Sequence, residues 1–244
     1  MENGNKYRRK MLEAAVKGNR GHLGGSFSCI EILMAIHNVM GKNDEFILSK
    51  GHSAIALYSL LFDDLELFLK DGSYLTEHPS ALIPGIRVTT GSLGHGIGLA
   101  AGIAMAKKLD NEPGRVYVLV GDGECMEGSV YEAMMFASIQ HLTNLTVILD
   151  LNKVMSTQNL PKIDYGKIFR EMLIVVHDVD GHNVEDMITE LRSPFRTTYT
   201  WPSLIVAHTI KGKGVSFMEN KHEWHNGVPN GEQLEIARKE LAND

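Results

Sequence analysis

The chain has 244 residues, of which 43% are hydrophobic and 22% are charged, and this suits one α/β domain with a full core. Its net charge of −6 argues against a nucleic-acid-binding face, which is normally basic. No apolar run reaches membrane-spanning length, and the two cysteines, Cys29 and Cys125, cannot form a disulfide framework. With no apolar signal core after residues 1–10, we expect a cytoplasmic protein without a membrane or nucleic-acid partner.

Helices and strands are expected to alternate along the chain. The first half predicts helices at 6–17, 30–40 (capped by Ser28), 54–62, 65–70 and 96–108, with a strand at 46–49, a glycine-rich break at 18–25 and a loop at 75–86. The second half predicts strands at 116–120, 145–151, 174–179 and 204–208, helices between 124 and 143, at 184–191 and at 232–241, and loops at 156–165 and 211–231. This alternation predicts an α/β fold with a doubly wound, mainly parallel sheet and helices on both faces, formed by residues 1–244 as a single domain.

Two polar signals close consecutive apolar runs. Gly121-Asp122-Gly123 ends the first run, and Asn152 ends the second. Because parallel strands present their carboxyl ends on one edge of a sheet, Asp122 and Asn152 are expected to converge there. A carboxylate and an amide oxygen are hard ligands that suit magnesium or calcium, and the glycines let a bulky anion approach the backbone. Each signal alone is more often a turn or a helix cap, but their combination fits a magnesium-bridged diphosphate.

Histidine gives the next signal. Five of the eleven histidines lie in glycine-rich or proline-containing loops, at His22, His52, His78, His95 and His225. A single loop histidine is more often a surface residue than a catalyst. Gly-His pairs ahead of helices place imidazoles where an anion would bind, so both interpretations stay open for each residue alone.

The stretch from Gly121 to Asn152 resembles the thiamine diphosphate motif, and the sequence inside it is similar to that of transketolases. The same resemblance extends over nearly the whole chain, through Gly21-His22, Ser49-Lys50-Gly51-His52, Thr89-Thr90-Gly91-Ser92-Leu93-Gly94, Lys211-Gly212-Lys213-Gly214 and Trp224-His225. Three positions depart from the family pattern. Glu77 replaces the glycine of a Gly-His-Pro motif, His95 stands where many members carry glutamine, and Asn226 intervenes before Gly227. The tract 159–176 is also shorter than in the family pattern.

This resemblance implies the diphosphate-binding domain of a thiamine diphosphate-binding fold, and the amino-terminal subunit of a split transketolase. It implies a Mg²⁺ ion, replaceable by Ca²⁺ or Mn²⁺, bound by Asp122, Asn152 and the backbone carbonyl of Val154. The implied cofactor-binding residues are His52, Gly91, Ser92, Leu93, Gly121, Asp122, Gly123, Glu124, Asn152, Lys211 and His225. The implied catalytic residues are His22, His52, His78, Glu127 and His225, with Glu127 facing a partner subunit.

The resemblance also implies the reaction and the assembly. The enzyme would transfer a two-carbon ketol unit from a ketose, or its phosphate, to an aldose. A carboxy-terminal subunit would supply the pyrimidine-binding domain, in an α2β2 assembly. An apolar face on the helix after Gly123 would meet a second subunit or, with about equal weight, pack on the sheet; its residues are Met126, Val130, Met134 and Met135.

Three alternatives remain at this point. One is a specialised thiamine diphosphate-dependent acyl or ketol transferase that acts on a substrate other than a pentose phosphate. Another is a non-catalytic regulatory relative, against which the intact Asp122, Asn152 and histidines argue. The last is a magnesium phosphohydrolase, which would need an early nucleophilic aspartate after a strand.

Overall fold

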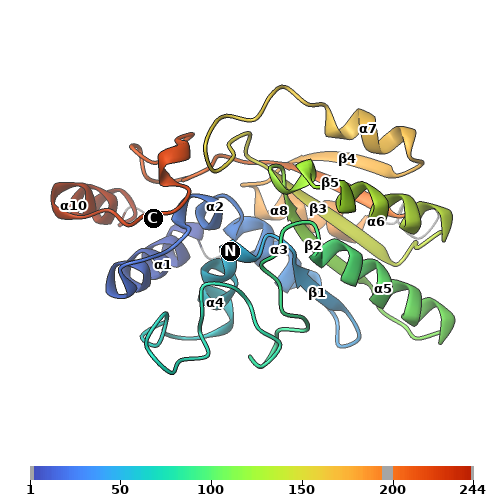
Figure 1. The fold of residues 1–244 in the computed structure, drawn as a ribbon, viewed down its shortest axis with the longest axis horizontal. Coiled ribbons are helices and arrows are strands. Elements are labelled where there is room, and N and C mark those ends of the chain that lie inside the picture. Colours follow the sequence, from blue (N-terminus) through green and yellow to red (C-terminus); the bar gives the residue numbers. More distant parts are fainter. Residues whose placement is uncertain (1–2, 194–199, 243–244) are drawn as a thin grey trace.

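The computed structural model describes residues 3–193 and 200–242, which form a parallel sheet covered by helices on both faces (Figure 1). The described strands lie in the order β1-β2-β3-β5-β4, and every pairing between them is parallel. Their bounds are β1 (Glu45–Leu48), β2 (Val116–Gly121), β3 (Leu145–Leu151), β4 (Val175–Asp180) and β5 (Ser203–His208). The predicted α/β fold with a doubly wound parallel sheet is therefore confirmed.

Two groups of helices enclose the sheet. One face carries α1 (Gly4–Gly18), α2 (Leu23–Ser28), α3 (Ile30–Val39), α4 (Ala54–Leu61) and α8 (Val184–Arg192). The other face carries α5 (Gly96–Leu109), α6 (Gly128–Ile139) and α7 (Tyr165–Glu171). The last helix, α10 (Gly231–Glu240), lies beside α1, where Arg238 Nε donates to Glu13 Oε1 over 2.8 Å. None of the described helices has the length and apolar character needed to cross a membrane.

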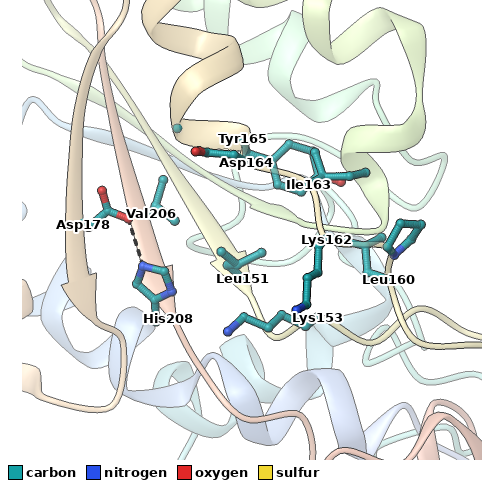
Figure 2. A pocket seen from close by; sticks show the side chains of 12 residues that line it. Leu151, Lys153, Leu160, Lys162, Ile163, Asp164, Tyr165, Asp178, Val206 and His208 are labelled. Carbon is teal, nitrogen blue, oxygen red and sulfur yellow. Dashed lines mark hydrogen bonds and ion pairs between the residues drawn. The ribbon is translucent and has the colours of Figure 1, made fainter.

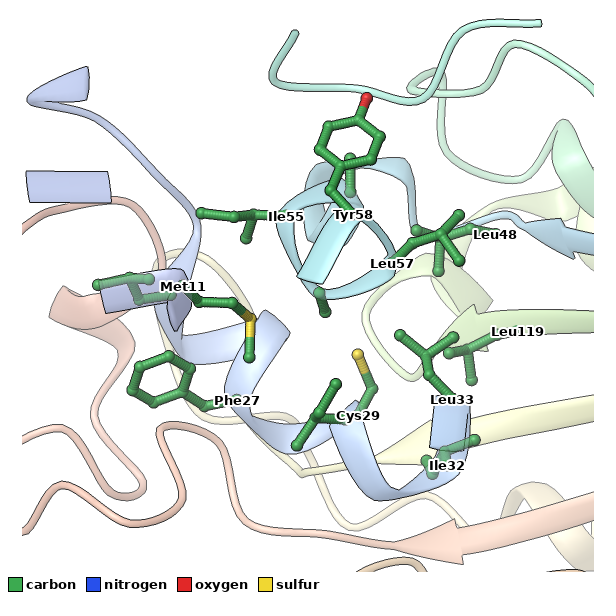
Figure 3. Close-up of a cluster of buried hydrophobic side chains, with 14 of the residues drawn as sticks. Met11, Phe27, Cys29, Ile32, Leu33, Leu48, Ile55, Leu57, Tyr58 and Leu119 are labelled. Carbon is green, nitrogen blue, oxygen red and sulfur yellow. The ribbon is translucent and has the colours of Figure 1, made fainter. Parts of the chain in front are cut away.

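The hydrophobic core has one layer on each face of the sheet. Figure 3 shows the layer under the amino-terminal helices, where Met11, Phe27 and Leu33 lie on three different helices and Leu119 lies on β2. The second layer joins α5 and α6 to the opposite side chains of the same strand, such as Val118. Both faces of β2 are buried, which explains why its sequence is a continuous apolar run rather than an alternation.

The predicted helix at residues 65–70 is wrong. These residues form turns, and Leu69 has a φ of 57°, in the left-handed region where an α-helix cannot continue. The Leu69 N–H donates to the carbonyl of Leu75 over 2.9 Å. The apolar residues of this segment are spaced as in a helix because Leu65 and Phe68 pack on the core, but they do so from a turn.

Two further predictions fail in the same short segment. The break at 18–25 is shorter than predicted, because α2 begins at Leu23. Ser28 does not cap the following helix, whose N-cap residue is Cys29. The Ser28 hydroxyl instead donates to the carbonyl of Gly25 over 3.0 Å and to Asp150 Oδ2 over 2.6 Å. Ser28 thus belongs to a buried polar network at the edge of the sheet.

Candidate active site

The polar segments that follow the strands lie together at the carboxyl edge of the sheet. Lys50 and His52 follow β1, Asp122 follows β2, Asn152 follows β3, and Lys211 comes shortly after β5. A cavity of about 260 Å³ opens between these segments. Its lining includes many of the predicted site residues, namely His52, Leu93, Gly121, Asp122, Gly123, Glu124, Glu127, Asn152, Val154, Lys211 and His225.

The three predicted metal ligands line this cavity together. Asp122 is only 2% exposed, and its carboxylate accepts hydrogen bonds from the backbone N–H of Gly123, over 2.7 Å, and from that of Lys153. Asn152 Oδ1 accepts from the N–H of Val154 over 3.1 Å. Lys153, with a φ of 66°, turns the chain sharply between Asn152 and Val154, so that both residues reach the cavity.

A divalent cation fits these residues. Burial, and then the charge of Asp150, raise the pKa of Asp122 to about 6. No described lysine or arginine forms an ion pair with this carboxylate, and no three described His, Cys, Asp or Glu side chains cluster as a metal site. A cation bound here would therefore combine one carboxylate with amide and carbonyl oxygens, the hard donors that Mg²⁺ and Ca²⁺ prefer.

A buried ion pair between Lys50 and Asp150, which no motif indicates, lies beside the cavity. Lys50 and Asp150 have only 1% and 0% of their side chains exposed. Asp150 also accepts from Ser28 and Thr209, and Lys50 donates to the carbonyl of Gly25 over 2.9 Å. Burial opposes both charges, yet Lys50 and these hydrogen bonds hold the pKa of Asp150 below its usual value, and Asp150 raises the pKa of Lys50. The available signal was an acid inside the apolar strand β3.

Glu124 ties the neighbouring loops together. Its buried carboxylate accepts hydrogen bonds from Ser49 Oγ (2.6 Å), the N–H of Gly94 (2.8 Å) and the N–H of Gly121 (3.1 Å). Burial is the main reason why the pKa of Glu124 is raised. Glu124 therefore contacts protein groups with both oxygens and fixes Leu93, one residue before Gly94, at the cavity wall.

Gly91 and Ser92 lie just outside the described lining of the cavity. Gly91 has a φ of 145°, and a Cβ at this position would lie 3.0 Å from Cδ2 of His78. This close approach needs glycine and sets the position of the His78 ring. Ser92 is exposed.

Four loop histidines form a cluster at the cavity. The ring centroid of His22 lies 5.4 Å from that of His52, 5.2 Å from that of His225 and 6.5 Å from that of His78. The rings of His52 and His225 are 5.2 Å apart, and Lys211 Nζ lies 3.0 Å from His225 Nδ1. The four histidines of the implied catalytic set therefore lie together, although only His52 and His225 line the cavity itself.

Burial favours the neutral form of two of these imidazoles, His52 and His225. It is the main reason why the pKa of His52 lies well below its usual value and why that of His225 is lowered to about 3. Burial, and then the charge of Lys50, also lower the pKa of Lys211 to about 8. Neutral imidazoles can accept protons. Lys50 is paired with Asp150, which leaves Lys211 to attract a phosphate group.

Despite the additional Asn226, the loop after Trp224 still contacts the rest of the site. The N–H of Gly227 donates to the carbonyl of Gly21 over 3.1 Å, and His22 and Gly227 form an isolated parallel bridge. The loop that carries His225 is thus joined to the first Gly-His pair.

The residues around α6 divide between the core and the surface. Val130 and Met134 are buried, whereas Met126 and Met135 are 54% and 42% exposed. The packing interpretation therefore holds for Val130 and Met134, and contact of Met126 and Met135 with a second subunit stays a prediction. Glu127 is exposed and precedes α6 at the mouth of the cavity. His95 is exposed at the start of α5 and lines a separate groove.

A second hollow, of about 440 Å³, lies between α7 and the strands β3, β4 and β5 (Figure 2). Leu151 and Val206 form its floor, and the segment 160–166 forms one wall. His208 Nε2 lies 2.9 Å from Asp178 Oδ1 at its side. None of the predicted site residues lines this hollow, so it is separate from the cavity at Asp122.

The chain is similar to known proteins in sequence and in fold. The sequence matches the family described as "Transketolase, thiamine diphosphate binding domain" over residues 4–244. It is 38% identical to an apulose-4-phosphate transketolase subunit of Phocaeicola vulgatus, in an alignment that covers 97% of this chain and 92% of that protein. It is 34% identical to the 6-deoxy-6-sulfo-D-fructose transketolase subunit SqwG of a Clostridium species, covering 97% and 94% of the two chains. Its fold is similar to the crystal structure of transketolase from Campylobacter jejuni, with a TM-score of 0.89 and 28% identity over 99% of this chain and 42% of that one.

Proposed function

The chain belongs to the transketolase family, and we propose that it is the diphosphate-binding subunit of a split, magnesium-dependent transketolase. The enzyme would transfer a two-carbon ketol unit from a ketose, or its phosphate, to an aldose, or its phosphate. The observation that carries this proposal is the convergence of Asp122, Asn152 and Val154 on one cavity beside four imidazoles. In this proposal residues 1–244 are one diphosphate-binding domain of a cytoplasmic enzyme.

Each part of the cavity has a role in this proposal. Asp122, Asn152 and the Val154 carbonyl would hold Mg²⁺, and Ca²⁺ or Mn²⁺ would suit the same oxygens. Lys211, His52 and His225 would bind the diphosphate, together with the glycine-flanked turn at Asp122 and the loop at Leu93. Bound thiamine diphosphate supplies the carbon nucleophile of ketol transfer.

The imidazoles would act on the sugar substrates. Neutral rings with lowered pKa values, as at His52, accept protons from hydroxyl groups and return them. His22 and His78 extend the cluster beyond the cavity lining, where a donor sugar would lie. Glu127 stands exposed at the mouth, in a position to meet a partner subunit.

The partner would be a carboxy-terminal subunit that supplies the pyrimidine-binding domain, in an α2β2 assembly. The names of two similar proteins support this, because they are called subunits and this chain covers 92% and 94% of their lengths. The exposed Met126 and Met135 offer adaptable apolar contacts for such an interface.

A ketol-transfer assay tests the proposal. The chain alone should show no turnover, and the chain mixed with a pyrimidine-binding subunit, thiamine diphosphate and Mg²⁺ should be active. An Asp122→Ala chain serves as the matched negative control. Robust turnover by the chain alone, or none in the complete mixture with any ketose donor, would contradict the proposal.

A second candidate concerns the substrate. The two similar subunits are named for apulose-4-phosphate, a branched ketose phosphate, and for 6-deoxy-6-sulfo-D-fructose, a sulfonated ketose. This favours the alternative of a specialised ketol transferase. A panel containing a linear pentulose phosphate, a branched ketose phosphate and a sulfonated ketose, compared by kcat/KM, would decide between the two.

A further inference from the structure

A carboxylate stands against the histidine cluster on the side away from Lys211. Glu77 Oε1 lies 3.1 Å from His22 Nδ1, and the Glu77 side chain is only 11% exposed. Arg20 binds the same carboxylate with two nitrogens, Nε at 3.1 Å from Oε1 and Nη2 at 2.7 Å from Oε2. With the ring contact between His22 and His225, these groups form a continuous row from Lys211 to Arg20.

The backbone that follows Glu77 is held in place at His78. The carbonyl of His78 accepts hydrogen bonds from Tyr58 Oη over 2.9 Å and from Thr76 Oγ1 over 2.8 Å. Gly91 packs against the ring of His78. These contacts hold the backbone next to Glu77, and the carboxylate itself contacts Arg20 and His22.

The chemistry of an acid beside an imidazole is specific. An acceptor at Nδ1 favours the tautomer with the proton on that nitrogen, which leaves Nε2 as the proton acceptor. Because Nδ1 of His22 faces Glu77, a ligand would be met by Nε2. The approach of His22 to Glu77 has the distance of an ion pair without the alignment of a hydrogen bond, a geometry that commonly tightens when a substrate binds.

We propose that Glu77 is a positioning residue for His22, which it orients so that Nε2 takes a proton from a hydroxyl group of the donor ketose. In this step the O–H bond breaks, an Nε2–H bond forms, and the electron pair stays on the sugar oxygen. The proton returns to the carbonyl oxygen of the acceptor aldehyde when that oxygen becomes a hydroxyl, so no other reagent is consumed. The inference rests on the proposed function and adds a residue at which this chain departs from the Gly-His-Pro pattern.

The groups around His22 determine in which direction its pKa should change when one of them is removed. Burial lowers the pKa of His22, Glu77 raises it, and His78, Arg20 and Lys211 lower it. The rings of His52 and His225 also face His22. Removing the Glu77 charge should therefore lower the pKa of His22, whereas removing the Arg20 charge should raise it.

Two variants and one control test the inference. Glu77→Gln keeps the shape and removes the charge, and Arg20→Met removes the opposite charge. Glu13→Gln is the matched control, because Glu13 also binds an arginine through two contacts of 2.8 Å but lies between α1 and α10, outside the site. Each chain is mixed with its partner subunit, and kcat/KM for the donor is measured across pH.

Glu77→Gln should lower kcat/KM for the donor by roughly tenfold or more and move the acidic limb of its pH profile to lower pH by roughly 1 unit. The thiamine diphosphate requirement should stay within about twofold, as for the control. An unchanged acidic limb, or a loss of activity that only follows a loss of cofactor affinity, would overturn the inference.

A readout without turnover separates this inference from the proposed function. Ring signals of ¹³C-labelled histidine in the full chain report the pKa of His22 directly, with a His22→Gln variant for assignment. A pKa that falls in Glu77→Gln and rises in Arg20→Met supports the coupling even if ketol transfer is not found. A pKa that does not move in Glu77→Gln refutes it, whatever the activity assay gives.

Discussion

Asp122 carries the only formal charge among the three predicted metal ligands, and it is almost completely buried. Asp122→Ala should therefore weaken Mg²⁺ and thiamine diphosphate binding together, by more than about a hundredfold, the upper end for partners that only orient a metal ligand. Asn152→Ala should cost less, about tenfold, because a neutral oxygen is lost. Calorimetric titration in the presence of the partner subunit measures both. Asp178→Asn, in the separate hollow of Figure 2, is the control, and an unchanged affinity in Asp122→Ala would contradict the metal assignment.

The ion pair of Lys50 and Asp150 makes a second prediction at this scale. Lys50→Met should reduce the free energy of unfolding by about 3–5 kcal/mol, because it leaves a buried carboxylate without its cation. The double variant Lys50→Met/Asp150→Asn should recover part of that loss, since the remaining amide still accepts from Ser28 and Thr209. Urea unfolding of the single and double variants measures the difference. A double variant as unstable as the sum of both singles would show that the charges do not interact.

Individual site residues differ in how well the sequence predicts them. Asp122 and Asn152 could be found because each ends an apolar run, and the strand order then brings them together. The role of Lys50 could not be found, because its partner Asp150 is distant along the chain and no local pattern encodes their contact. Glu77 was identified only as a departure from a motif, and its contact with His22 depends on how two loops meet.

At the scale of one element, α6 carries one methionine that contributes to stability and another that is available for association with a partner subunit. Met134→Ala should reduce the free energy of unfolding by about 2–5 kcal/mol, because this side chain is fully buried. Met135→Ala, at a side chain that is 42% exposed, should change it by less than about 0.5 kcal/mol but weaken binding to the partner subunit. Chemical unfolding and light scattering of the mixed subunits measure the two effects. Equal destabilisation by both variants would remove the distinction.

The elements themselves were largely predictable, and the failures have a common cause. The strands lie within one or two residues of their predicted bounds, because their apolar runs are bounded by polar or glycine residues. The predicted helix at 65–70 fails because Leu69 adopts a left-handed conformation that closes a turn. The short helix α2 was missed because Gly24 and Gly25 read as a break, whereas tertiary packing buries both glycines.

For the whole molecule, the expected relationship to the amino-terminal subunit of a split transketolase is confirmed by the matched family and by relatives named as subunits. The sequence could not give the order β1-β2-β3-β5-β4, because strand pairing depends on contacts between distant segments. Nor could it show that His22 and His78 lie beyond the described lining of the cavity, because the lining depends on how distant loops meet.

The buried histidines predict how the stability of the whole chain depends on pH. The pKa values of His52 and His225 are lowered in the folded state, so unfolding takes up protons below their unfolded pKa of about 6.5. The stability that these two neutral rings contribute should therefore be fully present above about pH 6.5 and should fall toward pH 5. Asp122 opposes this in part, because its raised pKa stabilises the folded state as the pH falls. Thermal unfolding at pH 7 and pH 5 measures this, and His225→Asn should flatten the dependence. A midpoint that rises on acidification would contradict the assignment of neutral, buried rings.

The contact between Lys211 and His225 has a consequence for the heat of ligand binding. With a pKa of about 8, the Lys211 amine is roughly half deprotonated at pH 8 before any anion arrives. A diphosphate beside these groups raises both pKa values, so the protein draws protons from the buffer as the ligand binds. The observed enthalpy should then differ between Tris and phosphate, in proportion to the ionisation heat of each buffer. The slope of the observed enthalpy against the ionisation enthalpy of the buffer gives the number of protons gained. A slope of zero would mean that both groups keep their charge on binding.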